Sequence, residues 1–335
     1  MDARSLRQSV AATDPLQGVS RQETIQTPAL LESRTPAMIA LLEKARLAAA
    51  SNATILLAGE SGTGKDVLAR QIHKWSPRAD HRLVTINCTS LPEQLLENEL
   101  FGHVRGAFTG AVSDQTGRLE AADGGTIVFD EIAELSATLQ IKLLRFVEEH
   151  RFERIGSNRT IKVDAQIIAA SNRNLETEVR EQRFRQDLYY RLNVIAFRLP
   201  PLRERLADIL PLADWMLKQL SQKIGRPAST LSPEAGEALL SYRWPGNVRQ
   251  LFNVLECAVA LTRSETIDLE DLPESLHNPE AELYIAQPDG TRLKDFEREH
   301  ILRALAENHT FEQAAATLGI DVSTLWRKRK RYGIS

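Results

Sequence analysis

Cysteine is scarce in this chain, and long apolar runs are missing from it. The 335 residues include only two cysteines, Cys88 and Cys257, which are too few for a disulfide framework and make a reducing cytoplasm the expected location. No apolar run reaches the length of a membrane span, and the first thirty residues lack the apolar core of a signal peptide. We therefore expect a cytoplasmic protein with no membrane partner.

An excess of charge of either sign is also missing. The 42 Lys and Arg residues nearly balance the 45 Asp and Glu residues, for a net charge of −3. This balance argues against a uniformly basic nucleic-acid coat but allows a local basic element. A hydrophobic content of 42% is that of ordinary globular protein, and the length leaves room for two or three domains.

A glycine-rich stretch lies between an apolar run, Thr54 to Ala58, and a helical pattern that continues from Val67 to His73. It consists of Gly59, Glu60, Ser61, Gly62, Thr63, Gly64, Lys65 and Asp66. A strand, a glycine loop and a helix in this order predict a phosphate-binding loop, in which backbone N–H groups and the helix N-terminus hold a polyphosphate. Lys65 would add a mobile positive charge for the outer phosphates. A plain glycine-rich turn is the alternative, and the flanking pattern disfavours it.

Asp66 stands where the generic motif has a Ser or Thr whose hydroxyl binds Mg²⁺. A second acidic site is therefore expected downstream. It is found after the turn at residues 123–125, where an apolar strand from Thr126 ends in Asp130 and Glu131. Asp130 can hold Mg²⁺ directly or through water, and Glu131 can orient and deprotonate an attacking water. Two carboxylates that simply cap the next helix are the alternative.

Two asparagines follow other predicted strands. Asn87 ends a short strand from Leu83, and Asn172 follows a strand predicted from Ile161 to Ala170. Site-lining residues in parallel sheets lie at such C-terminal strand ends. We expect Asn172 to reach a γ-phosphate or the attacking water, although an ordinary turn residue explains the position about as well.

Glycines at positions 102, 106 and 110 interrupt the segment from Glu99 to Ala111. They argue against an uninterrupted helix and predict a loop pushed out from one, with Phe108 and Thr109 at its tip. A Phe exposed on such a tip should meet a partner. The alternative, in which Phe108 folds back onto its own domain, remains open from the local chemistry.

The middle of the chain is predicted to be mostly helical. Apolar spacing predicts helices over Leu30–Ala50 and Thr138–Glu149. Arg185 and Arg191 lie six residues apart, which by itself is typical of a solvated helix face. Pro200-Pro201 marks a domain edge, and the helix-rich region 202–262 contains a turn into a helix that carries Arg249.

The C-terminal block, residues 291–335, has a helix-turn-helix pattern. Thr310 and Gln313 form a capping box before a short helix from Phe311 to Leu318, and a glycine turn at 319–321 precedes a second helix capped by Ser323. One face of that helix carries Thr324, Arg327, Lys328 and Arg331, while Leu325 points to the inter-helix core. Three cations on one face predict contact with DNA phosphates in a major groove. A solvated charged helix is the alternative.

Together these stretches resemble the NtrC-type bacterial enhancer-binding proteins, which activate sigma-54 RNA polymerase. The resemblance covers the chain from about Leu31 to its end. Its most specific motif reads GAFTGA and consists of Gly106, Ala107, Phe108, Thr109, Gly110 and Ala111.

The resemblance implies an α/β fold, namely an AAA+ parallel-sheet P-loop ATPase with a helical lid, followed by an all-α Fis-type helix-turn-helix domain. It implies ATP and Mg²⁺ as cofactors, and sigma-54 RNA polymerase holoenzyme and enhancer DNA as partners. It also implies a homo-oligomeric ring, usually a hexamer. The expected domains are a flexible segment 1–30, the ATPase subdomain 31–201, the lid 202–262, a linker 263–290 and the DNA-binding domain 291–335.

The resemblance also assigns roles to single residues. Gly59 to Asp66, with Val67, would bind the nucleotide as Walker A, and Asp130 and Glu131 would be the Walker B pair. Asn87 matches the residue that holds the catalytic glutamate off line, and Asn172 matches sensor I. Arg185 and Arg191 match the arginines offered to the neighbouring subunit's nucleotide, and Arg249 matches sensor II. The GAFTGA loop would contact sigma-54, and Ser323, Thr324, Arg327, Lys328 and Arg331 would contact DNA.

Two other functions fit part of the sequence. A DNA-bound AAA+ remodeller without sigma-54 contact explains the ATPase and the DNA-binding helices but not the GAFTGA loop. A repressor with an inert ATPase core is disfavoured by the intact Lys65, Asp130 and Glu131. Many family members begin with a phosphoacceptor receiver domain, and no such pattern is seen here, so we expect a truncated product or control by another route.

Overall fold

A computed structural model shows how these segments fold. It describes residues 32–227, 230–262, 264–277, 305, 310–317 and 322–331. The chain divides into two compact units after Pro273. The predicted flexible segment 1–30, residues 278–290 of the predicted linker and nearly all of the first helix predicted for the C-terminal block lie outside the described residues.

The first unit is built on a five-stranded parallel sheet, as predicted. Its strands follow the order β2-β5-β8-β1-β9, and they are β1 (Ile55–Ala58), β2 (Leu83–Asn87), β5 (Thr126–Asp130), β8 (Gln166–Ser171) and β9 (Ile195–Arg198). The register places Ala58 beside both Ser171 and Arg198. Because parallel strands all end at the same edge, the segments that follow β1, β5 and β8 meet there.

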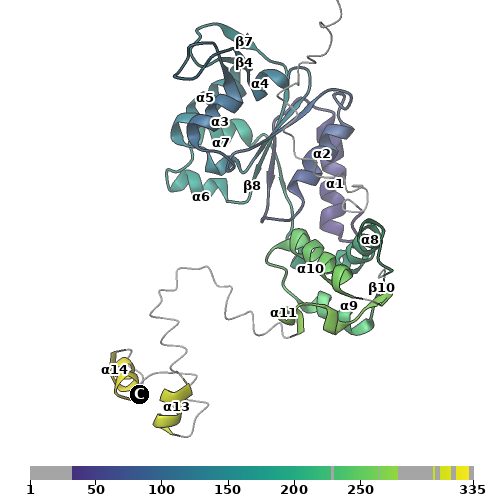
Figure 1. Cartoon of the computed structure of the whole chain (residues 1–335). Helices are drawn as coiled ribbons and strands as arrows, with labels where there is room; N and C mark the ends of the chain where they lie inside the picture. Colours follow the sequence, from purple (N-terminus) through teal and green to yellow (C-terminus); the bar gives the residue numbers. More distant parts are fainter. Residues whose placement is uncertain are drawn as a thin grey trace, which may run out of the picture. The chain divides into compact units, whose positions relative to one another are not determined.

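Helices cover both faces of this sheet (Figure 1). On one side lie α1 (Pro36–Ala49) and α2 (Lys65–Trp75), and on the other lie α3 (Glu93–Phe101), α5 (Ala137–Glu149), α6 (Leu175–Arg180) and α7 (Gln186–Leu192). In β1, Ile55 and Leu57 belong to the core beside α1 and α2, whereas Leu56 belongs to the core on the opposite face. Burial on both faces explains why the inner strands β1, β5 and β8 are mostly apolar, whereas the edge strands β2 and β9 carry exposed residues.

Several short helices and strands lie between α3 and α5, in addition to β5. They are β3 (Gly102–His103), β4 (Gln115–Thr116), α4 (Arg118–Ala121) and η2 (Ile132–Glu134). Strands β3 and β4 pair antiparallel, so they close the base of the loop that carries Phe108. This confirms the prediction of a loop pushed out after a helix, since α3 ends at Phe101.

The prediction of one strand from Ile161 to Ala170 is wrong. Residues of β7 (Thr160–Lys162) pair antiparallel with β6 (Arg151–Glu153), and the sheet strand β8 starts only at Gln166. Asp164 interrupts the extended run because its backbone bonds elsewhere: its N–H donates to Asp123 Oδ1 at 2.8 Å, and its carbonyl accepts from Gly124 N–H at 2.8 Å. Both partners are distant in sequence, so the apolar pattern alone did not reveal the break.

A helical lid completes the first unit, in agreement with the helix-rich pattern. Its elements are η3 (Leu202–Glu204), α8 (Leu206–Ile224), β10 (Thr230–Leu231), α9 (Pro233–Ser241), α10 (Asn247–Leu261), β11 (Thr266–Ile267) and η4 (Leu269–Asp271). Strand β11 pairs with β10, and Ile267 and Leu272 are buried. The linker predicted from residue 263 therefore begins too early, because few but well-buried apolar residues keep this acidic stretch in the lid.

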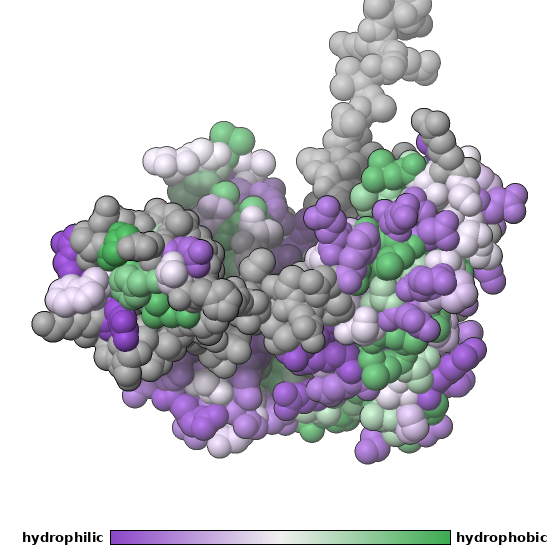
Figure 2. Space-filling view, turned by 90° about the horizontal axis from the view of Figure 1, so that it is seen from below, coloured by the Kyte–Doolittle hydropathy of each residue, from purple (hydrophilic) through white to green (hydrophobic). Residues whose placement is uncertain are grey.

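The face of the molecule shown in Figure 2 is of mixed character. Seen from below, hydrophobic residues lie among hydrophilic ones (Figure 2), which is usual for protein surfaces. Within the described residues, no helix has both the length and the apolar character that a bilayer crossing needs.

The second unit contains the predicted pair of C-terminal helices. Its described elements are α11 (Glu274–His277), α13 (Phe311–Thr317) and α14 (Val322–Arg331). Thr310 Oγ1 accepts the Gln313 N–H at 3.2 Å, as a capping residue should. Leu325 is buried, as predicted, and α13 and α14 are in contact. The prediction that Ser323 caps this helix is wrong, because α14 begins at Val322, two residues earlier than such a cap implies, and Ser323 lies in its first turn. The turn 319–321 is outside the described residues.

Candidate active site

The glycine loop lies at the C-terminal edge of the sheet, between β1 and α2. Gly62 and Gly64 have φ angles of 77° and 97°, a region that glycine adopts without steric cost. Helix α2 begins at Lys65, directly after Gly64, so its N-terminal N–H groups face the loop. This arrangement suits an anion.

Lys65 is folded over the loop rather than out into solvent. Its Nζ donates to the carbonyls of Gly59 at 2.8 Å and Glu60 at 3.1 Å. Burial lowers the pKa of Lys65, and the negative charges of Glu131 and Asp130 oppose that shift. The ammonium group is thus held beside the two carboxylates that the sequence singled out.

Asp130 and Glu131 lie where β5 ends, next to the end of β8. Glu131 has a φ of 55°, which is unfavourable for a residue with a side chain and is often found at functional sites. Its Oε2 accepts the Asn172 N–H at 3.0 Å, and Asp130 Oδ1 accepts the Glu131 N–H at 3.1 Å. Burial raises the pKa of Asp130, and Lys65 opposes that shift. These contacts hold the Glu131 carboxylate in one place.

The two asparagines contact the site in different ways. Asn87 lies beside Asp130 in the register of β2 and β5, but its Oδ1 accepts the Thr89 N–H at 2.9 Å and the Thr89 hydroxyl at 2.6 Å. A bond between Asn87 and Glu131 is absent from the described structure. Asn172 contacts Glu131 through its backbone N–H, and the contact of its side chain with a γ-phosphate or the attacking water stays a prediction. Residue type gives no signal for a backbone contact, so the sequence could not reveal it.

A metal site made by protein side chains alone is absent from the described residues, which contain no group of three His, Cys, Asp or Glu placed to share an ion. Asp66 is half exposed and lies 3.7 Å from Arg70. Asp130, beside Lys65 and the loop, is the carboxylate that fits Mg²⁺ held jointly with phosphate oxygens and water.

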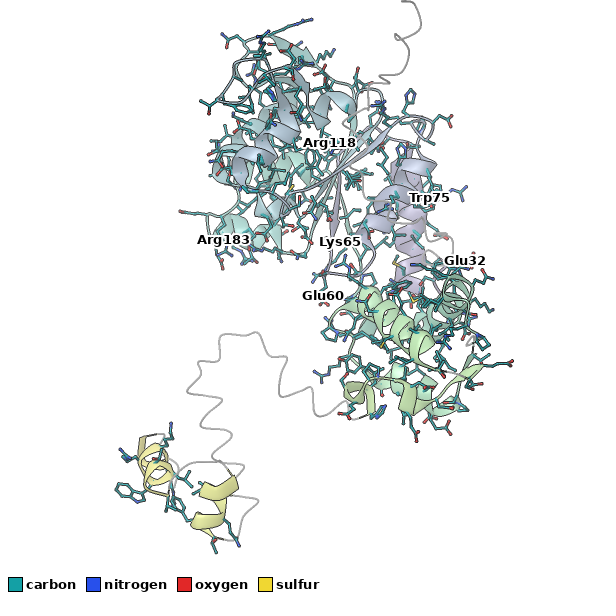
Figure 3. All side chains as sticks on the ribbon, in the orientation of Figure 1. Glu32, Glu60, Lys65, Trp75, Arg118 and Arg183 are labelled. Atoms are coloured by element: carbon teal, nitrogen blue, oxygen red, sulfur yellow. The ribbon has the colours of Figure 1, made fainter. Side chains whose placement is uncertain are left out.

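The lid is bonded directly to the glycine loop by residues that the sequence reasoning missed. Asn247 is fully buried at the start of α10; its Nδ2 donates to Ser61 O at 3.0 Å, and its Oδ1 accepts the Leu202 N–H at 2.7 Å. Arg203 forms a two-pronged pair with Glu60, with N···O distances of 2.7 and 2.5 Å. Hydrogen bonding from Arg203 lowers the pKa of Glu60 despite its partial burial. Figure 3 shows Glu60 where the sheet meets the lid, near Lys65.

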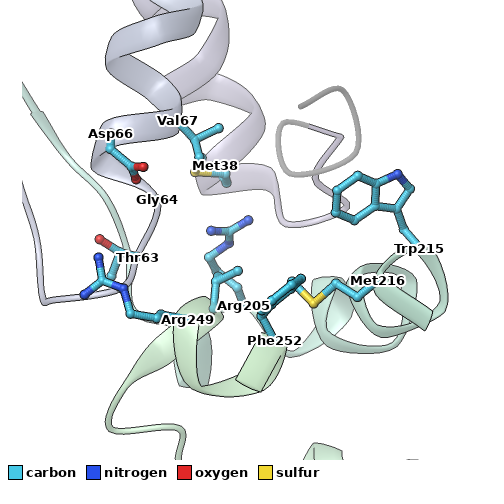
Figure 4. Close-up of a pocket in the computed structure, with 12 residues that line it drawn as sticks. Met38, Thr63, Gly64, Asp66, Val67, Arg205, Trp215, Met216, Arg249 and Phe252 are labelled. Carbon is cyan, nitrogen blue, oxygen red and sulfur yellow. The ribbon is translucent and has the colours of Figure 1, made fainter. Parts of the chain in front are cut away.

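A cavity of about 180 Å³ lies beside the loop, between α2 and the lid (Figure 4). Arg249 of α10 lies at this cavity and donates from Nη1 to Ser61 Oγ at 3.2 Å. The walls are mostly apolar, with polar groups from the loop and two arginines: Met38, Gly62, Thr63, Gly64, Asp66, Val67, Arg205, Trp215, Met216, Val248, Arg249 and Phe252. An apolar slot next to a phosphate loop is suited to a nucleoside.

Arg185 and Arg191 do not line this cavity. Helix α7 lies on the opposite side of the sheet from α2 (Figure 1). Arg185 bonds to Asp187 at 3.0 and 2.7 Å, and Arg191 bonds to Glu148 at 2.8 Å. Both side chains remain exposed, at 43% and 61%. An arginine that serves a neighbour's site needs this accessibility.

Phe108 combines the two situations left open by the sequence. Its ring lies on the imidazole of His103, with centroids 4.9 Å apart, yet the residue is 47% exposed. The loop is closed behind it by the Gly106 N–H bond to Ala111 O at 2.9 Å. Thr109 is exposed beside it. The tip therefore presents an aromatic ring that rests on its own domain but is still available to a partner.

Helix α14 carries the predicted DNA-contacting residues. Arg327 is exposed, and Thr324 and Lys328 are half-buried. The Arg329 guanidinium lies over the Phe311 ring, 5.7 Å from its centroid. The side chains of Ser323 and Arg331 are outside the described residues.

A first prediction concerns the close approach of lid and loop at Gly62. A Cβ there would lie 2.3 Å from the carbonyl oxygen of Gly246, and the φ of Gly62 is 77°. Gly225 has a similar φ of 71° with open space around it, so it is a matched control. We expect Gly225→Ala to cost about 1–2 kcal/mol through backbone strain alone. Gly62→Ala should cost more and weaken ATP binding, as urea unfolding and nucleotide titration would measure. Equal losses for the two variants would contradict this.

Comparison with known families finds three matches along the chain. The profile of the Sigma-54 interaction domain matches residues 31–198, that of the AAA+ ATPase lid domain matches residues 203–285, and that of the bacterial regulatory protein Fis family matches residues 292–332. The order of the three is the order expected from the sequence.

Individual proteins are similar over most of the chain. The alginate biosynthesis transcriptional regulatory protein AlgB of Pseudomonas putida is 51% identical over 312 residues, covering 91% of this chain and 67% of its own length. The Nif-specific regulatory protein of Azotobacter vinelandii is 46% identical over 299 residues, covering 86% of this chain and 56% of its own. The crystal structure of NtrX from Brucella abortus in complex with ATP has a TM-score of 0.67 at 32% identity, covering 90% of this chain and 69% of that one.

Proposed function

The chain belongs to the sigma-54-dependent transcriptional activators with an AAA+ ATPase domain, and from this premise we propose how its residues couple ATP hydrolysis to promoter opening. The observation that carries the proposal is that Lys65, Asp130 and Glu131 meet at one sheet edge of the unit that also presents the Phe108 loop. Because the ATPase site and the exposed Phe108 loop belong to one compact unit, hydrolysis at the site could move the loop.

ATP would lie with its base in the apolar cavity and its phosphates on the loop. Lys65 would exchange its bonds to the Gly59 and Glu60 carbonyls for the outer phosphates, because a carbonyl is a weaker partner than a polyphosphate. Asp130 would hold Mg²⁺, which supplies charge neutralisation at the phosphates. Glu131 would take a proton from the attacking water, from a position fixed by the Asn172 N–H.

The site would be completed by a second copy of the chain. Arg185 caps α7 and Arg191 lies in it, and both are exposed on the opposite side of the sheet from α2. In a ring, which we take to be a hexamer, they would reach the neighbour's γ-phosphate and stabilise its developing charge. Asn87, one strand away from Glu131, would be free to engage that carboxylate in another state of the cycle.

The C-terminal unit would bind enhancer DNA in the cytoplasm. Thr324, Arg327 and Lys328 of α14, together with Ser323 and Arg331, would contact bases and phosphates. Tethering the ring upstream raises its local concentration near a looped promoter. Hydrolysis would then move the Phe108–Thr109 tip against sigma-54 and convert the closed polymerase complex to the open one.

Two measurements test the whole proposal. Purified protein should hydrolyse ATP, and with a transition-state analogue of ATP it should capture sigma-54 in a pull-down. Hydrolysis without sigma-54 capture would favour a remodeller of another target, and absence of hydrolysis would favour a repressor with an inert core.

A second prediction separates ATP hydrolysis from the opening of the promoter complex. Thr109→Ala and Phe108→Ala should keep the ATPase rate, because the tip contacts no nucleotide-site residue in the described structure. Open-complex formation should fall roughly 30-fold, as for loss of an interface anchor of about 2 kcal/mol. Val112→Ala is the control, since Val112 is 82% exposed just beyond the motif. Variants of the tip that retain full transcription would refute the loop's role.

A further inference from the structure

A buried carboxylate links the beginning of the ATPase unit to its lid. Asp208, in the first turn of α8, is only 1% exposed. It accepts four hydrogen bonds: from Ser33 Oγ at 2.6 Å, Arg34 N–H at 2.6 Å, Thr35 N–H at 3.1 Å and Arg205 Nε at 2.9 Å. Three of these donors lie immediately before α1, more than 170 residues away in sequence. Glu32, the neighbour of Ser33, is seen beside the lid in Figure 3.

The bonds are strong enough to keep this carboxylate ionised. Burial alone would raise the pKa of Asp208, but hydrogen bonds from Ser33, Arg34 and Arg205 outweigh burial and lower it. Charge-assisted bonds of this kind are about twice as strong as neutral ones. Because Arg205 is itself only 3% exposed, loss of the Asp208 charge would leave a buried cation without its partner.

Arg205 connects this cluster with the nucleotide cavity. Its Nε donates to Asp208, and the remainder of its guanidinium group lies among the cavity-lining residues, between Arg249 and Met38 (Figure 4). A planar guanidinium fixed at one nitrogen keeps the direction of the others. The same carboxylate therefore orients a cavity residue and holds the backbone of Arg34 and Thr35.

We propose that Asp208 is a positioning residue that holds Arg205 toward bound nucleotide and couples nucleotide binding to the backbone just before α1. The proposal rests on ATP binding in the cavity described above. When the lid settles on a nucleotide, α8 carries Asp208 with it and tightens the bonds to Arg34 and Thr35. Coupling between two sites is reciprocal, so displacement of residues 33–35 would in turn weaken nucleotide binding.

Amide hydrogen exchange tests the coupling in the unmodified protein. The Arg34 and Thr35 amides donate to Asp208, and residue 36 is a proline without an amide. A short peptide that starts at least two residues before Arg34 and ends soon after Pro36 therefore reports on these bonds. A non-hydrolysable ATP analogue should slow exchange at the two amides. If the analogue binds and their exchange does not change, the coupling is refuted. If no analogue binds at all, the proposed function fails first, and a nucleotide titration distinguishes the two cases.

Variants test the positioning role. Asp208→Asn should raise the KM for ATP roughly tenfold, with a smaller effect on kcat, and abolish the nucleotide-dependent protection at Arg34 and Thr35. Asp214→Asn is the matched control, an exposed acid on the same helix. Ser33→Ala removes one donor without stranding a buried charge, so it should show the same changes to a smaller extent even if Asp208→Asn folds poorly. An unchanged KM in folded Asp208→Asn and Ser33→Ala would overturn the assignment.

Discussion

Glu131→Gln should abolish ATP turnover and leave ATP binding intact. A general base in a proton-transfer step contributes roughly 10²–10⁴-fold, and glutamine cannot take the proton. The amide oxygen can still accept the Asn172 N–H that Glu131 Oε2 accepts at 3.0 Å, so the site should keep its shape. Phosphate release would measure turnover, and titration with a fluorescent ATP analogue would measure binding.

The control for this variant is Glu134→Gln. Glu134 lies three residues after Glu131, in η2, and pairs with Arg173 at 2.6 Å. The Glu134→Gln substitution therefore removes a nearby negative charge and leaves the proposed base unchanged. It should hydrolyse ATP normally. Ordinary turnover by Glu131→Gln would remove Glu131 from the mechanism, whereas loss of ATP binding in that variant would point to a structural role.

Arg185→Ala and Arg191→Ala should each lower kcat by roughly 10³–10⁵-fold if the arginine serves as a finger. Both are surface residues paired with Asp187 and Glu148, and such pairs contribute little to stability. The variants should therefore unfold like the wild type, and the loss should lie in hydrolysis. Arg180→Ala, another exposed arginine on the neighbouring helix α6, is the control that should remain active.

Mixing experiments test whether these arginines act between subunits. Lys65→Ala and Arg191→Ala proteins are each expected to be inactive alone. When mixed, some interfaces would pair an intact Lys65 with an intact Arg191, and activity should return in part. Wild-type ATPase activity per chain should also rise with protein concentration. No complementation, together with equal specific activity at every dilution, would show that the site is complete in one chain.

The local pattern of apolar residues and glycines determined most of the strands and loops that surround the site. The strands β1, β2 and β5 and the glycine loop were predictable from short apolar runs and from the need for glycine at positions such as Gly64, with its φ of 97°. The strand β8 was predicted with the wrong start, and β9 was not predicted. The loop that carries Phe108 was predictable for a similar reason, since its glycines disfavour an uninterrupted helix, and the family resemblance identified its GAFTGA motif. These features depend on residues within a few positions of one another.

Tertiary structure alone decided which polar groups bond to these strands and loops. Asn247 reaches Ser61 across 186 positions, Arg203 reaches Glu60 across 143, and Asp208 reaches Ser33 across 175. The backbone N–H of Asn172 and the break at Asp164 are equally invisible to periodicity. Spacing encodes the direction of a side chain relative to its own helix or strand, but its partner is set only when separate elements pack and each buried polar group must find a donor or acceptor.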